Sequence, residues 1–257
     1  MKKLVAMLLA LMLVCSVMAF AAAEDSDVAY VQGKGTLVVG ITDFAPMDYK
    51  DADGNWIGFD ADLARAFGEK LGVTVEFIEI DWDNKILELN AKTVDCIWNG
   101  MTLTDEVNAA MSCTATYLNN SQVIVMSADK LAEMPEEATA EDFAALSFAV
   151  EAGSAGEEVA TDLGFNVTPV TSQAAALMEV SAGTSDACVI DLLMAMAMTG
   201  EGTGYANLDY GYELNEESYV IGFRTGSDLT ALCDEFLAAA AEDGTIEALT
   251  AKYIVGE

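Results

Sequence analysis

Aromatic and acidic side chains stand just after several predicted strands of this chain. Phe44 follows a β-branched run, Trp82 lies between two aspartates after a second strand, and Asp191 follows the apolar run 187–190. Aromatic rings attract cations, and a carboxylate accepts charge-assisted hydrogen bonds from an ammonium group. Open parallel sheets bind ligands beyond the carboxyl ends of their strands, so these side chains predict one wall of a small-molecule cleft.

Polar residues follow two further predicted strands, 94–98 and 147–151. They are Asn99, Gly100, Met101, Thr102 and Ser154. Asn99 and Thr102 supply hydrogen-bond donors and acceptors, and Gly100 lets a ligand approach the backbone closely. Free amides at the start of the helix after Ser154 favour an anion such as a carboxylate.

Each of these positions also has an ordinary structural interpretation. Phe44 suits core packing, and Asn99–Thr102 suits a strand-to-helix turn with Thr104 as the helix cap. Ser154 and Asp191 are both good N-cap residues. The residue types alone leave these alternatives open.

The elements that must position these residues alternate between strand and helix in two blocks. The first block reads β-α-β-α-β, with strands 36–41, 73–78 and 94–98 and helices 60–71, capped by Asp60, and 83–91. The second has strands 122–126, 147–151, 167–170 and 187–190 and helices 140–146, 155–163, 173–182 and 191–199. Helices 228–241 and 245–254 end the chain. This order predicts an α/β fold of two lobes, with parallel sheets, right-handed crossovers and a cleft between the lobes.

Residues 1–23 predict a secretory signal peptide rather than part of the fold. Two lysines precede the apolar run 4–20, and two Ala-x-Ala cleavage sites follow. An uncleaved membrane anchor is the alternative, but the run is somewhat short for a span. We therefore expect an exported protein, either periplasmic or held at the cell surface.

The chain is strongly acidic, with a formal net charge of −32 from 11 basic and 43 acidic residues. Removal of residues 1–23, which carry two lysines and no acids, leaves −34. Nucleic acid and anionic membrane surfaces are therefore excluded as partners. The charge either serves solubility or creates a field that favours a cationic ligand.

Cysteine and histidine content narrows the chemistry further. The chain has no histidine, which excludes Ser-His-Asp triads and His-based zinc sites. Four cysteines follow residue 23, and Cys96 and Cys188 lie in apolar segments that suit buried free thiols. Asp51–Gly54 predicts a hairpin turn rather than a calcium loop, because the later ligand positions do not match. We expect neither a metal nor a cofactor.

Five motifs together resemble those of a known family. They occur in the order LVVGITDFAPMDYKDADGNWIGFDADLARAFGEKLG, VDCIWNGMTLT, AVEAGSAGEE, SDACVID and DGTIEALTAKY. Over residues 35–256 the chain resembles the extracytoplasmic solute-binding proteins of polar amino-acid ABC importers, bacterial solute-binding protein family 3. The resemblance implies a type II periplasmic-binding-protein fold with a two-stranded hinge. Lobe 1 would comprise residues 33–119 and 222–257, and lobe 2 residues 120–221.

The resemblance also implies roles for individual residues. Phe44 and Trp82 would flank the ligand side chain, and Gly100 and Thr102 would contact its backbone groups. Ser154 would hold the carboxylate, and Asp191 would accept hydrogen bonds from the α-amino group. The partners implied are a small amino-acid-like solute and a transmembrane ABC permease, with the protein acting as a monomer and without catalysis.

One departure from the family pattern is serious. The family usually has an arginine after the GMTLT-like motif, where it clamps the ligand carboxylate, and this chain has Val107 there. Valine offers neither charge nor donor, so we expect altered specificity, for an amine or a cationic or decarboxylated amino acid. The alternatives are a ligand-binding sensory protein and a lyase or dehydratase on the same fold.

Overall fold

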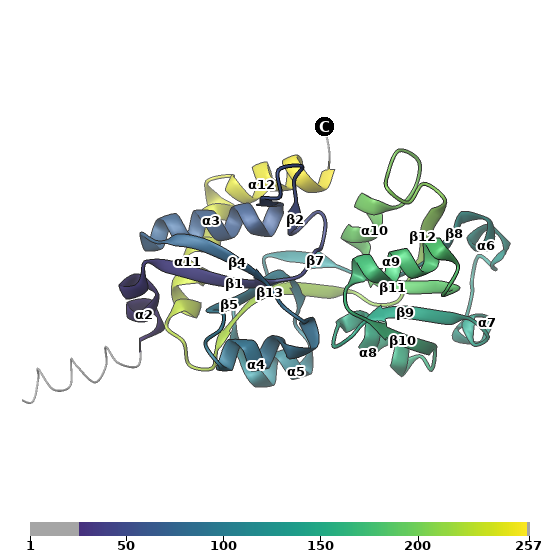
Figure 1. Cartoon of the computed structure of the whole chain (residues 1–257), viewed down its shortest axis with the longest axis horizontal. Helices are drawn as coiled ribbons and strands as arrows, with labels where there is room; N and C mark the ends of the chain where they lie inside the picture. Colours follow the sequence, from purple (N-terminus) through teal and green to yellow (C-terminus); the bar gives the residue numbers. More distant parts are fainter. Residues whose placement is uncertain (1–25, 256–257) are drawn as a thin grey trace, which may run out of the picture.

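The computed structural model describes residues 26–255, so the predicted signal peptide lies outside the described residues. The described chain forms two β-sheets that lie side by side, each flanked by helices (Figure 1). This arrangement confirms the predicted α/β architecture. None of the described helices is long and apolar enough to cross a membrane.

The first sheet has the strand order β4-β1-β5-β13-β6, with β7 paired to β13. Its strands are β1 (Thr36–Ile41), β4 (Thr74–Glu79), β5 (Cys96–Thr102), β6 (Met111–Cys113), β7 (Leu118–Asn120) and β13 (Glu217–Arg224). β4, β1 and β5 run parallel, as predicted, whereas β13 is antiparallel to β5, β6 and β7. The sheet is therefore mixed, because the C-terminal strand returns beside the parallel core.

Helices, short turns and a small hairpin surround the first sheet. They are α2 (Asp27–Lys34), the hairpin β2 (Tyr49–Lys50) and β3 (Trp56–Ile57), α3 (Phe59–Leu71), the 3₁₀ turn η1 (Trp82–Asn84), α4 (Lys85–Asn90), α5 (Asp105–Ala110), α11 (Leu229–Glu242), α12 (Thr245–Thr250) and the π turn η2 (Ala251–Val255). The prediction that Asp60 caps α3 is wrong. The N-cap is Gly58, and the Asp60 side chain is buried. Its Oδ2 accepts hydrogen bonds from Gly100 N and the Tyr117 hydroxyl.

The second sheet has the order β10-β9-β11-β8-β12. Its strands are β8 (Gln122–Ser127), β9 (Ser147–Glu151), β10 (Asn166–Val170), β11 (Ala187–Asp191) and β12 (Leu208–Glu213). Its helices are α6 (Ala128–Glu133), α7 (Ala140–Phe143), α8 (Ala155–Asp162), α9 (Gln173–Ala182) and α10 (Leu192–Met198). β10, β9 and β11 are parallel, β8 is antiparallel to β11, and β12 is antiparallel to β8.

The chain passes between the sheets twice, from β7 into β8 and from β12 into β13. β13 pairs with the first sheet from its first residue, where Glu217 lies opposite Asn120. The predicted division at residue 222 therefore cuts through β13, and residues 217–221 belong to the first sheet. The division at residue 222 was implied by the family resemblance and not by the strand pairing.

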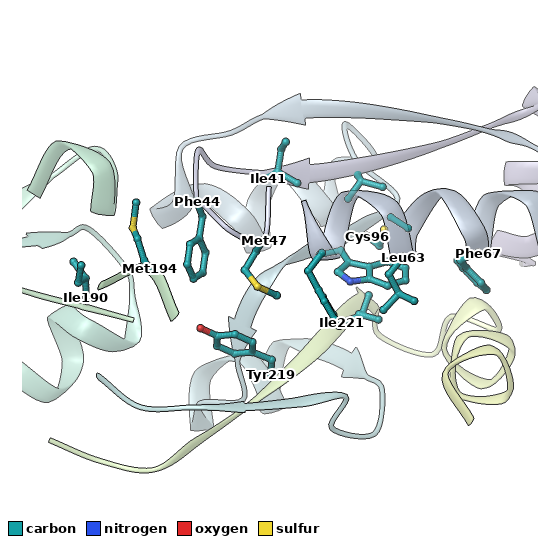
Figure 2. Packing of buried hydrophobic residues seen from close by; sticks show 14 of the residues in the cluster. Ile41, Phe44, Met47, Leu63, Phe67, Cys96, Ile190, Met194, Tyr219 and Ile221 are labelled. Carbon is teal, nitrogen blue, oxygen red and sulfur yellow. The ribbon is translucent and has the colours of Figure 1, made fainter. Parts of the chain in front are cut away.

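Aromatic side chains connect the core of the first sheet to the second. The Phe44 and Tyr219 rings meet edge to face, 6.5 Å apart. Figure 2 shows Phe44 between Met47 and Met194 of α10, with the Tyr219 hydroxyl pointing toward the second sheet. All four described cysteines are free thiols, as expected, and Cys96, Cys188 and Cys233 are buried.

Candidate functional site

A cavity of about 360 Å³ lies between the two sheets. This volume suits a small-molecule site. All eight predicted site residues line it: Phe44, Trp82, Asn99, Gly100, Met101, Thr102, Ser154 and Asp191. The structure thus brings together residues from the carboxyl ends of strands in both sheets.

The residues after Trp98 continue strand β5 rather than forming a turn. β5 extends to Thr102, which lies opposite Tyr219 of β13. Thr104 then caps α5, because its Oγ1 accepts a hydrogen bond from Val107 N, 3.2 Å away. The predicted end of this strand at residue 98 is wrong, because pairing with a distant segment extends it.

The Asn99 side chain serves the fold. Its Oδ1 accepts hydrogen bonds from the backbone N and hydroxyl of Thr42, and its Nδ2 donates to Thr42 O and Asp48 Oδ2. Asn99 lines the cavity with its amide already fully bonded. Its role is therefore to hold the strand end in place.

Gly100 has a positive φ of 53°, and a Cβ atom there would lie 2.6 Å from the Phe44 ring. Only glycine allows the ring to pack this closely against β5. Its backbone N–H donates to Asp60 Oδ2 at 2.6 Å. The close approach predicted for a ligand is thus made by Phe44 instead.

The two predicted aromatic wall residues, Phe44 and Trp82, are both buried. Phe44 is 2% exposed and belongs to the core as well as to the cavity wall. Trp82 is also buried, with 7% of its surface exposed. The Lys85 ammonium lies 5.3 Å from the Trp82 ring centroid, so one face of that ring already has a cation beside it.

The start of helix α8 already holds an anion from the protein itself. Ser154 caps the helix, and its Oγ accepts a hydrogen bond from Glu157 N at 3.1 Å. Gly153 N donates to Glu157 Oε2 at 2.7 Å. The free amides predicted for a ligand carboxylate are therefore partly engaged by Glu157.

Asp191 ends β11 and is 4% exposed. Its side chain does not cap α10. Instead Oδ1 accepts hydrogen bonds from Asn120 Nδ2 and the Tyr219 hydroxyl, and Oδ2 accepts from Gln173 Nε2. Burial raises the pKa of Asp191, and the nearby Glu217 raises it further. Since a carboxylate has about four acceptor positions, Oδ2 retains one for a ligand donor.

Sequence reasoning missed every charged residue of the cavity lining except Asp191, including the buried Lys85 and Glu151. Lys85 is buried, and its Nζ donates to Gly153 O at 2.8 Å, which joins α4 to the loop before α8. A Cβ on Gly153 would lie 2.8 Å from Asp83 Cα, so the two sides of the cleft touch here. Glu151 ends β9, and the strand-end argument that identified Asp191 would have found it.

The described lining residues carry six carboxylates and one ammonium group. The acids are Glu106, Glu151, Glu157, Glu158, Asp162 and Asp191, and the cation is Lys85. Val107 also lines the cavity and is 1% exposed. The cavity is thus lined mainly by acids, and a cationic solute is electrostatically favoured there.

Two buried acids make the stability of the unliganded protein depend on pH. Burial raises the pKa of Asp60 to about 7 and that of Glu151 to about 8. Between about pH 4 and these values the folded protein keeps protons that the unfolded chain has released. Stability should therefore fall as pH rises through this window, by up to about 1.4 kcal/mol per pH unit for each group.

Urea unfolding at about pH 5, 7 and 9 measures this dependence. Asp60→Asn keeps an acceptor oxygen for Gly100 and should flatten the slope below about pH 7. A free energy of unfolding that rises between pH 5 and 8 would contradict the buried-acid account. The lowered pKa of Asp186, about 2, affects stability only at more acidic pH.

The family model for bacterial extracellular solute-binding proteins, family 3, matches residues 37–256. The chain belongs to this family. The family indicated by the sequence motifs is confirmed, and with it the extracellular or periplasmic location and a binding rather than a catalytic role.

Individual relatives match over nearly their whole length. The chain is 28% identical to the arginine-binding extracellular protein ArtP of Bacillus subtilis (strain 168), covering 97% of this chain and 98% of ArtP. It is 28% identical to the L-cystine-binding protein TcyA of the same strain, covering 96% of each. A crystal structure of an ArgBP mutant from T. maritima aligns with a TM-score of 0.81 and 29% identity, covering 90% of this chain and 100% of that chain.

Proposed function

We propose that this solute-binding protein captures a cationic, amino-acid-like solute by its nitrogen end and delivers it to a transmembrane ABC permease. The observation that carries the proposal is the composition of the cavity wall, six carboxyl groups against one ammonium group. The protein acts as a monomer, and its two lobes close on the solute about the β7 and β13 connections.

Recognition of a carboxylate is weakened at two places. Val107 occupies the position where the family usually has an arginine, so no guanidinium faces the cavity there. At α8, a ligand carboxylate would compete with Glu157 for Gly153 N. Burial of an unpaired carboxylate costs several kcal/mol, so a solute without one binds better.

Lys85 favours a second candidate, an ordinary zwitterionic amino acid. Its ammonium group is the single cation among the described lining residues, and it has a third N–H besides those directed at Gly153 and Trp82. A ligand carboxylate that reached this group would have one charged partner. Lys85→Met separates the two candidates, because it would weaken only the binding of solutes that carry a carboxylate.

Four compounds with the same carbon chain test the proposal by calorimetry. L-Lysine has a carboxylate and a second ammonium, 1,5-diaminopentane lacks the carboxylate, L-norleucine lacks the second ammonium, and 1-aminopentane lacks both. We expect each amine to bind at least about 10-fold more tightly than its amino acid, because no cation is positioned for the carboxylate. Tighter binding of both amino acids, lost in Lys85→Met, would support the zwitterion instead.

A further inference from the structure

Glu151 is a buried acid in the cavity wall, and one of its carboxyl oxygens has no hydrogen-bond donor. It is 2% exposed at the carboxyl end of β9. Among residues 26–255, its Oε1 is fully buried without a hydrogen-bond partner. Asp191 in the same cavity, by contrast, accepts three hydrogen bonds from the protein.

A second buried acceptor beside the cavity also lacks a hydrogen-bond donor. Gln122 Oε1 is buried without a donor, whereas its Nε2 donates to Glu217. Buried acceptors without donors are costly, and native proteins leave few of them. Two such oxygens in one cavity point to a ligand group that is rich in N–H donors.

Lys85 does not neutralise Glu151. Its ammonium group donates to the carbonyl oxygens of Gly153 and Trp82 and makes no ion pair with Glu151 among the described residues. A cation of the solute would therefore be the first positive group to pair directly with Glu151.

We infer that Glu151 is the counter-ion for a second positively charged group of the solute, the first being the nitrogen that Asp191 binds. The solute class is then a compound with two cationic ends, a diamine or a basic amino acid. The inference rests on the proposed function for the nitrogen at Asp191. It does not depend on whether the solute also carries a carboxylate.

Binding of such a solute should release a proton. Burial raises the pKa of Glu151 to about 8. Lys85 on α4 and the side chains of Gln173 and Thr42 oppose this shift, and Asp81 before η1 reinforces it. Asp191 faces the same cavity from β11. The unliganded carboxyl group therefore holds its proton at pH 7. An incoming ammonium favours the ionised form, so the proton leaves to the buffer as the ion pair forms.

Glu151→Gln tests the inference with the same four compounds. The native protein should bind 1,5-diaminopentane about 100-fold more tightly than 1-aminopentane, and L-lysine about 100-fold more tightly than L-norleucine. Glu151→Gln should reduce both ratios to less than about 5-fold. Calorimetry in two buffers of different ionisation enthalpy should detect up to one more proton released per diamine at pH 7 in the native protein than in the variant.

Glu141→Gln is the matched control, because it removes one negative charge from an exposed position on α7, outside the cavity lining. It should leave both ratios unchanged. Thermal unfolding should show that Glu151→Gln is at least as stable as the native protein, since it removes a buried unpaired acid. If Glu151→Gln loses both affinity ratios but is also less stable, a second variant, Glu151→Leu, decides. Glu151→Leu must then also abolish both affinity ratios.

The outcomes distinguish this inference from the proposed function. The role of Glu151 would be overturned if the affinity ratios persist in Glu151→Gln, or if they are near one in the native protein. The proposed binding of amines would still stand. If the two amines bind weakly but L-lysine still binds more tightly than L-norleucine, the role of Glu151 is supported. The argument that a ligand carboxylate weakens binding is then overturned. Failure of all four compounds to bind would overturn both.

Discussion

Val107→Arg should convert the cavity into one that prefers zwitterionic amino acids. Val107 is buried in the wall, and its backbone is fixed by the Thr104 cap at the start of α5. A guanidinium at this position can pair bidentately with a ligand carboxylate. We expect the affinity for L-lysine to rise about 100-fold and that for 1,5-diaminopentane to fall about 10-fold, measured by calorimetry.

Val107→Leu is the control for this prediction, because it adds volume without charge. It should change the binding of L-lysine and of 1,5-diaminopentane by similar factors. If Val107→Arg also leaves their affinity ratio unchanged while remaining folded, residue 107 does not face the carboxylate position, and the argument from the missing arginine is wrong.

Asp191→Asn should reduce the binding affinity for every nitrogen-bearing solute by about 100-fold or more. Asp191 is buried at the end of β11, and Tyr219, Asn120 and Gln173 hold its carboxylate in one orientation. Asparagine keeps the shape but removes the charge that pairs with an ammonium, a change that typically costs about 3–5 kcal/mol when the pair is buried. The measurement is calorimetric titration with 1,5-diaminopentane and L-lysine.

Urea unfolding separates this loss from a loss of folding. The raised pKa of Asp191 means that its ionised form is unfavourable in the unliganded protein, so the neutral asparagine should not reduce stability strongly. Glu141→Gln again controls for net charge. Unchanged affinity of a folded Asp191→Asn variant would remove Asp191 from the binding site.

Most of the fold could be predicted because local patterns and global topology agree. The helix from residue 60 to Leu71 shows apolar residues at helical spacing, and Gly72 ends it with a left-handed conformation, φ 75°. The extension of β5 to Thr102 and the full length of β13 could not be predicted in the same way. Both depend on pairing between segments more than 100 residues apart, which local residue preference does not encode.

In the candidate site, too, some features could be predicted from local sequence and others depend on contacts between distant residues. The strand-end rule placed Asp191 and Ser154 at the cavity, and it would also have placed Glu151. What local reasoning could not foresee is which polar groups the protein itself occupies. The Asn99 amide is fully bonded by Thr42 and Asp48, and Gly153 N is bonded by Glu157. These pairings depend on three-dimensional contacts and decide which groups remain for a solute.

A crystal structure of the protein with 1,5-diaminopentane tests the central claim most directly. The account predicts one nitrogen of the diamine within hydrogen-bond distance of the Asp191 carboxylate and the other beside Glu151, with Glu157 still bonded to Gly153. A diamine bound outside the space between the two sheets, or one whose nitrogens contact neither acid, would contradict it.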